Sequence, residues 1–226
     1  MKRMKWNYLV AAGLMAFAAL STQAQEKKAQ ASSPITFGIR AGVSLQNING
    51  RDAGDNKLEN KLVPRFQGGV NVELPLADEF YLQPGIMFAA KGTEFKGSNS
   101  NLNISYLEIP VTFLYKPVVG TGKLLLGVGP YIGFGIAGTI KPQNGNSSDV
   151  KFENTITALQ AITNTYLRKT DAGANLLFGY ELSNMFSVQL NAQLGLTKIN
   201  PDIEGINNNK TMFKNTGFGL SVGYRF

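Results

Sequence analysis

Eight charged residues sit in stretches where apolar and polar residues alternate, and their carboxylates are the first candidates for chemistry. They are Arg40, Glu73, Lys91, Glu108, Lys116, Asp171, Glu181 and Arg225. Two carboxylates held close together can act as general acid and base. The chain has no His and no Cys, so the commonest base and the thiol nucleophile are both missing. Because isolated buried charges are costly and must pair, we interpret the eight as a network of internal ion pairs, and we predict no catalytic residue.

A glycine pattern between Gly133 and Gly138 matches the spacing of a dinucleotide-binding fingerprint. That fingerprint has meaning only where a strand leads into a helix. Here it lies inside a predicted strand, so we interpret these glycines as space for neighbouring side chains such as Tyr131. No cofactor is predicted.

A first polar loop carries Asp52, Asp55, Asn56 and Glu59, which are oxygen ligands of the kind that Ca²⁺ prefers. Their spacing does not match an EF-hand loop. We therefore interpret the segment as a solvated loop, and no metal site is predicted.

The elements that must position the charged residues are strands with a two-residue period. In the run 35–46, for example, Phe37, Ile39 and Val43 alternate with Gly38, Arg40 and Ser44. Successive side chains of a strand point to opposite faces. The alternating runs are 35–46, 65–76, 80–91, 104–116, 123–138, 171–182, 185–197 and 213–226. Each of the eight runs has twelve to sixteen residues. Strands that cross a bilayer need about 9–11 residues each, so the runs are long enough.

The connections decide which face of these strands points outward. Long polar segments, 47–63, 92–103, 139–170 and 198–212, alternate with the short ones 77–79, 117–122 and 183–184. A soluble lipocalin-like barrel would bury the apolar face, but long loops at one end and tight turns at the other are typical of bacterial outer-membrane barrels. The prediction is an all-β, eight-stranded antiparallel up-and-down transmembrane β-barrel with its polar face inside.

Aromatic residues of the apolar face gather at the predicted short-turn end. They are Phe80, Tyr115, Tyr180, Phe186, Tyr224 and Phe226. Aromatic side chains are enriched at the membrane–water interface, so we predict a periplasmic aromatic girdle here.

The third long loop contains a second period. Apolar residues recur at three- and four-residue spacing within 149–168, at Phe152, Ile156, Leu159, Ile162 and Tyr166. This favours a short amphipathic helix with Ser148 or Asp149 as N-cap. An irregular loop with chance periodicity is the alternative.

The N-terminus has the three parts of a secretory signal. Lys2, Arg3 and Lys5 precede the apolar run 9–20, and small residues follow up to Ala24. A membrane anchor would need about 20 apolar residues. We predict a cleavable signal peptide over 1–24, a short flexible segment over 25–33 and the barrel domain over 34–226. No Cys follows the small residues, which excludes a lipoprotein anchor.

The charge balance argues against a nucleic-acid partner. Three of the 22 Lys and Arg residues lie in the first 24 residues, which leaves 19 against 15 Asp and Glu. They are spread along the chain, whereas nucleic-acid binding needs a clustered basic stripe.

Four of the alternating stretches resemble a known family. They are YLQPGIMFAAKG (81–92), YLEIPVTFLYKP (106–117), LLGVGPYIGFGI (125–136) and DAGANLLFGYEL (171–182). These blocks resemble, in order, the outer-membrane protein β-barrel domain often labelled "porin family protein", which includes PorT-like proteins, and the similarity covers residues 34–226. Proline recurs in this family where this chain has Pro84, Pro110 and Pro130, so the resemblance implies local bulges there.

The chain end also resembles a known signal. Tyr224 and Phe226 match the C-terminal pattern read by the barrel-assembly machinery, which the resemblance makes a partner during insertion. Phe226 is also the last lipid-facing residue of a strand, and the two roles are compatible.

Together these observations favour a non-enzymatic integral protein of the outer membrane in a Gram-negative bacterium, surrounded by outer-membrane lipid. An eight-stranded barrel is filled by its own side chains, so an open diffusion pore is not expected. The long loops would then carry structural or binding roles, including contact with an envelope protein partner. Two alternatives stay open: a narrow solute or ion channel, and a secretion or envelope-assembly accessory of the PorT-like kind.

Overall fold

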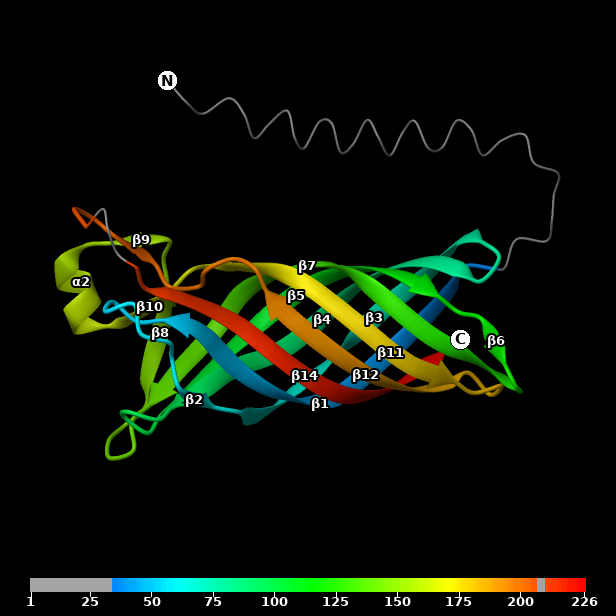
Figure 1. Ribbon diagram of the computed structural model, residues 1–226, viewed down its shortest axis with the longest axis horizontal. Helices are drawn as coiled ribbons and strands as arrows, with labels where there is room; N and C mark the ends of the chain where they lie inside the picture. The colour runs from blue at the N-terminus through cyan, green and yellow to red at the C-terminus, as the bar shows by residue number, and fades with distance from the viewer. Residues whose placement is uncertain (1–33, 207–209) are drawn as a thin grey trace, which may run out of the picture. The chain divides into compact units, whose positions relative to one another are not determined.

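Eight long antiparallel strands close on themselves into one barrel (Figure 1). The computed structural model describes residues 34–206 and 210–226, so the predicted signal peptide and the segment 25–33 lie outside the described residues. The strands are β1 (Thr36–Arg51), β3 (Val63–Ala77), β4 (Phe80–Phe95), β5 (Ser100–Tyr115), β7 (Gly122–Lys141), β11 (Thr170–Glu181), β12 (Phe186–Gly195) and β14 (Met212–Arg225). Each pairs with its neighbours in this order, and β14 pairs with β1. The eight predicted runs are confirmed as these strands.

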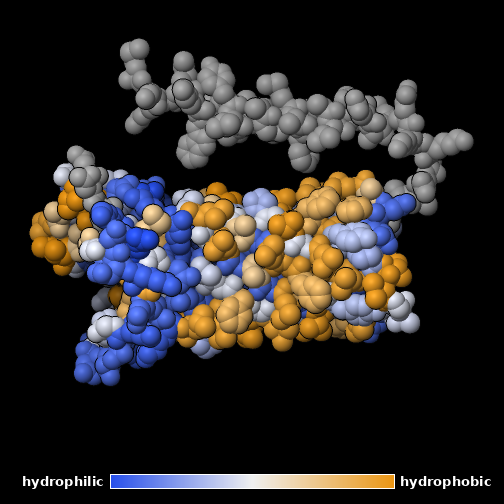
Figure 2. Space-filling model, in the orientation of Figure 1, coloured by the Kyte–Doolittle hydropathy of each residue, from blue (hydrophilic) through white to orange (hydrophobic). Residues whose placement is uncertain are grey.

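The apolar face of every strand points outward. The cross-strand register places Val43, Leu220 and Leu190 side by side on adjacent strands, and all three are exposed. Their polar neighbours Ser44, Ser221 and Gln189 are buried. Figure 2 shows the resulting belt of hydrophobic residues around the strands, with hydrophilic residues gathered at the end that carries α2. We call this surface the apolar belt.

The two ends of the barrel differ. At the short-turn end, tight turns at 78–79 and 182–185 and the segment 116–121, with β6 (Val118–Val119), lie beside Thr36 and Arg225. The opposite, long-loop end carries 52–62 with β2 (Asn60–Lys61), 96–99, 142–169, 196–206 and 210–211. The expectation of a long loop over 92–103 is wrong. Strands β4 and β5 continue pairing as far as Phe95 and Ser100, which leaves a four-residue turn.

The third connection is more regular than a loop. It contains β8 (Ser148–Phe152), β9 (Thr155–Ile156), the helix α2 (Ala158–Thr163) and β10 (Thr165–Leu167). The predicted short helix is therefore present, but its expected cap is wrong. Ser148 and Asp149 begin β8, and Thr157 is the N-cap, in a capping box with Gln160. No helix among the described residues is long and apolar enough to cross a membrane.

Pro84, Pro110 and Pro130 do not cause bulges, contrary to the expectation from the resemblance. Pro84 and Pro110 lie in β4 and β5, whose pairing keeps one register on both sides of them. Pro130 is opposite Ala174 in an unshifted β7–β11 ladder. Irregularities occur instead at Pro75/Ala77 and at Ser105/Tyr106. A proline removes one donor, and long ladders on both sides hold the register across that gap.

The apolar belt predicts a position-dependent cost for an added charge. Leu220, in β14, and Leu62, in the connection 52–62, have the same exposed fraction, 49%. We expect Leu220→Arg to destabilise the barrel by about 2–4 kcal/mol, because the charge would lie in hydrocarbon. Leu62→Arg should change the free energy of unfolding little. Denaturant unfolding in lipid vesicles measures both, and equal effects would show that Leu220 does not face lipid.

Candidate functional site: the filled lumen and the long-loop end

Near the short-turn end, four charged side chains form what we call the turn-end ion cluster. Lys116 Nζ lies 2.8 Å from Glu73 Oε2 and 2.9 Å from Glu181 Oε2. The guanidinium of Arg225 lies 2.6 Å from Glu73 Oε1 and 3.5 Å from Glu181 Oε2. Gln83 Nε2 donates a further hydrogen bond of 3.0 Å to Glu73. Two cations thus face two buried carboxylates, and the cluster has no net formal charge.

A second group, the middle ion cluster, lies further toward the long-loop end. Lys91 Nζ is 2.5 Å from Glu108 Oε1 and 3.0 Å from Asp171 Oδ2, and both Lys91 and Asp171 are fully buried. The hydroxyl of Tyr131 and the amide of Asn215 donate to Asp171 at 3.1 and 2.9 Å. Lys91 Nζ also lies 4.3 Å from the centre of the Tyr131 ring. The cluster has one cation for two carboxylates.

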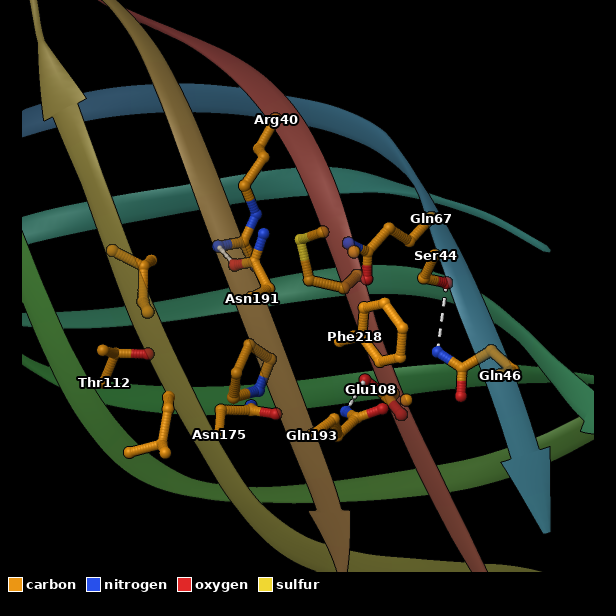
Figure 3. A pocket seen from close by; sticks show the side chains of 16 residues that line it. Arg40, Ser44, Gln46, Gln67, Glu108, Thr112, Asn175, Asn191, Gln193 and Phe218 are labelled. Carbon is orange, nitrogen blue, oxygen red and sulfur yellow. Dashed lines mark hydrogen bonds between the residues drawn. The ribbon is translucent and has the colours of Figure 1, made fainter. Parts of the chain in front are cut away.

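Arg40 is the eighth charged residue of the set, and it belongs to neither cluster. No carboxylate lies within ion-pair distance of it in the described chain, and its Nη1 donates 3.2 Å hydrogen bonds to Gln189 Oε1 and Asn191 Oδ1. It borders a cavity of about 30 Å³ that is also lined by Gln46, Gln67 and Glu108 (Figure 3). The structure thus places all eight predicted residues inside the barrel and brings seven of them into two clusters.

Between the middle ion cluster and the long-loop end, buried apolar side chains fill the lumen. The apolar plug, as we call it, consists of buried residues from strands β1 and β5, from β8 and β10, and from the connection that follows β12. They are Ile48, Leu102, Ile104, Tyr106, Val150, Leu167 and Ile199. The sequence reasoning missed this plug. The signal was present, because the inward positions of β5 change from Glu108 to Ile104 and Leu102 toward the long-loop end.

The glycines of β7 make room for this filling. A Cβ on Gly135 would lie 2.3 Å from the ring of Phe152, which comes from β8. On β11, Gly173 is opposite Tyr131, and a Cβ on Gly173 would lie 2.7 Å from the Tyr131 ring. The pattern between Gly133 and Gly138 therefore lies within a strand and serves packing.

Aromatic rings gather at the short-turn end. Phe80 stacks on Tyr115 with 4.8 Å between ring centres, and Phe186 lies 4.8 Å from Tyr224. Tyr180 donates a 2.6 Å hydrogen bond to the Val119 carbonyl. Tyr224 and Phe226 lie 6.0 Å apart, and the Phe226 backbone exchanges two hydrogen bonds with Phe37. This is the arrangement that a girdle requires, but its depth in a membrane and the barrel-assembly role of Tyr224 and Phe226 stay predictions.

The carboxylates of the first loop do not converge. Asp52 accepts hydrogen bonds from Asn56, Asp55 pairs with Arg51 and Lys210, and Glu59 pairs with Lys96. In the described ranges, no three acidic side chains come together as a metal site would require.

The third and fourth loops are joined to each other. β9 pairs in parallel with β13 (Asp202–Ile203), and the backbone amide of Arg168 donates to the Ile199 carbonyl. Asp202 pairs with Arg168 at 2.5 Å and also with Lys198. The hydrogen bond from Lys198 and the charge of Arg168 hold the pKa of Asp202 below its ordinary value. Because Asp55 pairs with Lys210, the first loop is tied to the fourth as well.

This architecture matches a known family over most of the chain. Residues 23–200 match the family model described as the outer membrane protein beta-barrel domain. The chain belongs to this family. Its members lie in the outer membrane, and the family resemblance expected from the sequence is confirmed.

Solved structures with a similar arrangement come from several bacteria. Ail of Yersinia pestis, in complex with a heparin analogue, is 12% identical and covers 86% of this chain and 100% of its own, with a TM-score of 0.43. Neisserial surface protein A is 10% identical, with coverages of 86% and 100% and a TM-score of 0.46. OprG of Pseudomonas aeruginosa is 14% identical, with 86% and 97% and a TM-score of 0.46. A search of curated proteins finds none that matches. At these identities the likeness carries no information on function.

The turn-end ion cluster predicts a strong coupling in stability. Lys116→Met should destabilise the barrel by about 3–5 kcal/mol, because it leaves two buried carboxylates with one cation. Lys116→Met combined with Glu181→Gln should be more stable than Lys116→Met alone, since the excess charge is gone. Urea unfolding in vesicles measures both variants. A cost below about 1 kcal/mol for the single variant would mean that these charges are solvated.

The junction of the third and fourth loops predicts a pH dependence. A lowered pKa means that folding stabilises the ionised Asp202, so this contribution is present at neutral pH and is lost as the pH falls through the lowered pKa. Asp202→Asn should raise amide exchange around β9 and β13 by up to about fivefold, as expected for an exposed pair. Asp149→Asn, in the third connection and with no ion pair in the described structure, is the control. Equal exchange in both variants at neutral pH would contradict the assignment.

Proposed function

We propose that this outer-membrane barrel is a closed, non-enzymatic membrane body whose long-loop end makes structural or binding contacts outside the cell. The observation that carries this proposal is the filling of the lumen. From the short-turn end upward, it holds the turn-end ion cluster, a cavity of about 30 Å³, the middle ion cluster and the apolar plug. These groups occupy the interior that a path for solute would need, which supports a closed barrel.

The long-loop end is suited to binding because its loops support one another. The first, third and fourth loops are linked by Asp55, Asp202 and the β9–β13 pairing. On this base the capped helix α2 exposes Leu159 and Ile162, with exposed fractions of 69% and 82%. Large aliphatic side chains displayed at an otherwise polar end are a feature of protein contact surfaces. We propose an envelope protein as the partner.

We also propose how the chain is exported and which end of the barrel faces the periplasm. The basic and apolar pattern of residues 1–24 supports export by a cleavable signal peptide. The aromatic rings and the terminal Tyr224 and Phe226 support a periplasmic short-turn end, with the barrel-assembly machinery acting on the last strand. The long-loop end would then face outward among outer-membrane lipids.

Planar bilayers test whether the barrel is closed. The purified protein should show no steady conductance. A narrow channel would instead conduct, and its current would change on neutralising Glu108 or Arg40, which line the cavity. Such a current would overturn the closed-body proposal.

Single cysteines test the orientation and the display of α2, because the chain has no Cys of its own. On intact cells, Ile162→Cys should react with a membrane-impermeant maleimide. Asp78→Cys, in a short turn, should react only after the outer membrane is permeabilised. The reverse pattern would contradict the proposed orientation.

Co-purification from native membranes, with Leu159→Ser/Ile162→Ser as the matched variant, then tests the partner. An unchanged set of bound proteins would argue against contact through α2, and loss of a secretion component would favour the assembly-accessory alternative.

A further inference from the structure

Buried polar atoms without a hydrogen-bond partner gather around the cavity beside Arg40. Arg40 Nε, Gln46 Oε1 and Gln67 Nε2 are buried and have no hydrogen-bond partner among the described residues. All three side chains line the cavity of about 30 Å³. Figure 3 shows Arg40 at the top of the cavity, Gln67 and Gln46 at its right, and Glu108 and Gln193 below. Buried polar atoms are nearly always hydrogen-bonded, so three orphaned atoms around one space point to a ligand in it.

The size of the cavity limits the ligand. A water molecule needs roughly 10–15 Å³ of such space and two to four polar partners. The cavity therefore fits about two water molecules, and an organic solute does not fit. The orphaned atoms supply two donors, from Arg40 and Gln67, and one acceptor, from Gln46. Thr112 and Asn175 also line the space and can complete the hydrogen bonds of two waters.

The charge of the surrounding groups separates water from a small anion. Arg40 has no carboxylate within ion-pair distance in the described chain, and an unpaired buried cation would favour an anion. The middle ion cluster, however, has one carboxylate more than it has cations, and Glu108 of that cluster lines the same cavity. An anion would also face the carbonyl oxygen of Gln46. Both contacts are repulsive for an anion and are hydrogen bonds for water.

We propose that this cavity is a hydration site that holds about two long-lived water molecules between Arg40, Gln46, Gln67 and Glu108. The waters complete the hydrogen bonds of the Arg40 guanidinium and connect it with the carboxylate of Glu108, the nearest excess charge. The site is independent of the proposed binding role of the loops. It makes Arg40 the water-bridged member of an interior whose other charges pair directly.

Nuclear magnetic resonance of the full-length protein in lipid nanodiscs tests the site directly. Water cross-peaks with the sign of long-lived water should appear at the side-chain amide protons of Gln46, Gln67 and Asn175. In Gln67→Leu, which removes one orphaned donor, the remaining cross-peaks should fall by at least about half, because one of the waters loses its anchor. Gln67→Met serves the same purpose if the leucine variant does not fold. Met87→Leu, at an apolar lining position, is the matched control and should keep them.

Three results would overturn the proposal. Absence of the cross-peaks in the unaltered protein would mean that the cavity is dry. Cross-peaks that persist unchanged in Gln67→Leu would place the water elsewhere. Crystals soaked in sodium bromide distinguish the ion, because an anomalous peak beside Arg40 would show an anion site. No bromide peak, together with the cross-peaks, supports water.

Discussion

The interior of this barrel is governed by the cost of burying charge in a narrow space. A strand that crosses a membrane alternates between lipid and lumen, so the polar half of each strand is forced inward. With eight strands there is too little room for bulk water, and each inward charge must find a partner on another strand. The direct pairs of Lys116 and Lys91 with carboxylates from other strands meet this requirement. Arg40 meets it less directly, through amide oxygens at the edge of the cavity.

The same constraint separates the barrel into a rigid body and a specialised end. In the body, polar residues such as Ser44 and Gln189 are buried inside and large hydrophobic residues cover much of the exterior (Figure 2), so this part is suited to the membrane. Toward the long-loop end the lumen changes from charges to hydrocarbon at Ile104 and Leu102. Because Val150 and Leu167 of this plug come from the connection 142–169, the filling of the lumen and the shape of the outer surface depend on each other. A mutation in that connection affects both.

Much of this was predictable from the sequence, and the failures have physical causes. The number of strands follows from a strict two-residue period, as in 35–46, and the outward apolar face follows from the alternation of long and short connections. Neither signal depends on distant contacts. The pairing of Lys91 with both Glu108 and Asp171 was not predictable, because it depends on shear between strands. The N-cap at Thr157 was missed because the apolar spacing from Phe152 to Tyr166 combines residues of three strands, β8, β9 and β10, with those of a helix. The bulges expected at Pro84 and Pro110 are absent, because the long hydrogen-bonded ladders on both sides keep the register where proline lacks a donor. The residues around each proline do not reveal how long those ladders are.

The seam between β1 and β14 has a consequence for the order of assembly. The two strands of this seam come from the two ends of the domain. Phe37 and Phe226 are joined by backbone hydrogen bonds, and Gly38 lies opposite Arg225. Until this seam closes, Arg225 stays far from Glu73, so the turn-end ion cluster is incomplete. A contact between such distant parts of a chain forms late. Insertion without closure would therefore expose unmatched charges and two open strand edges to hydrocarbon. Insertion into the membrane and closure of the barrel between β1 and β14 are thus coupled into one cooperative event.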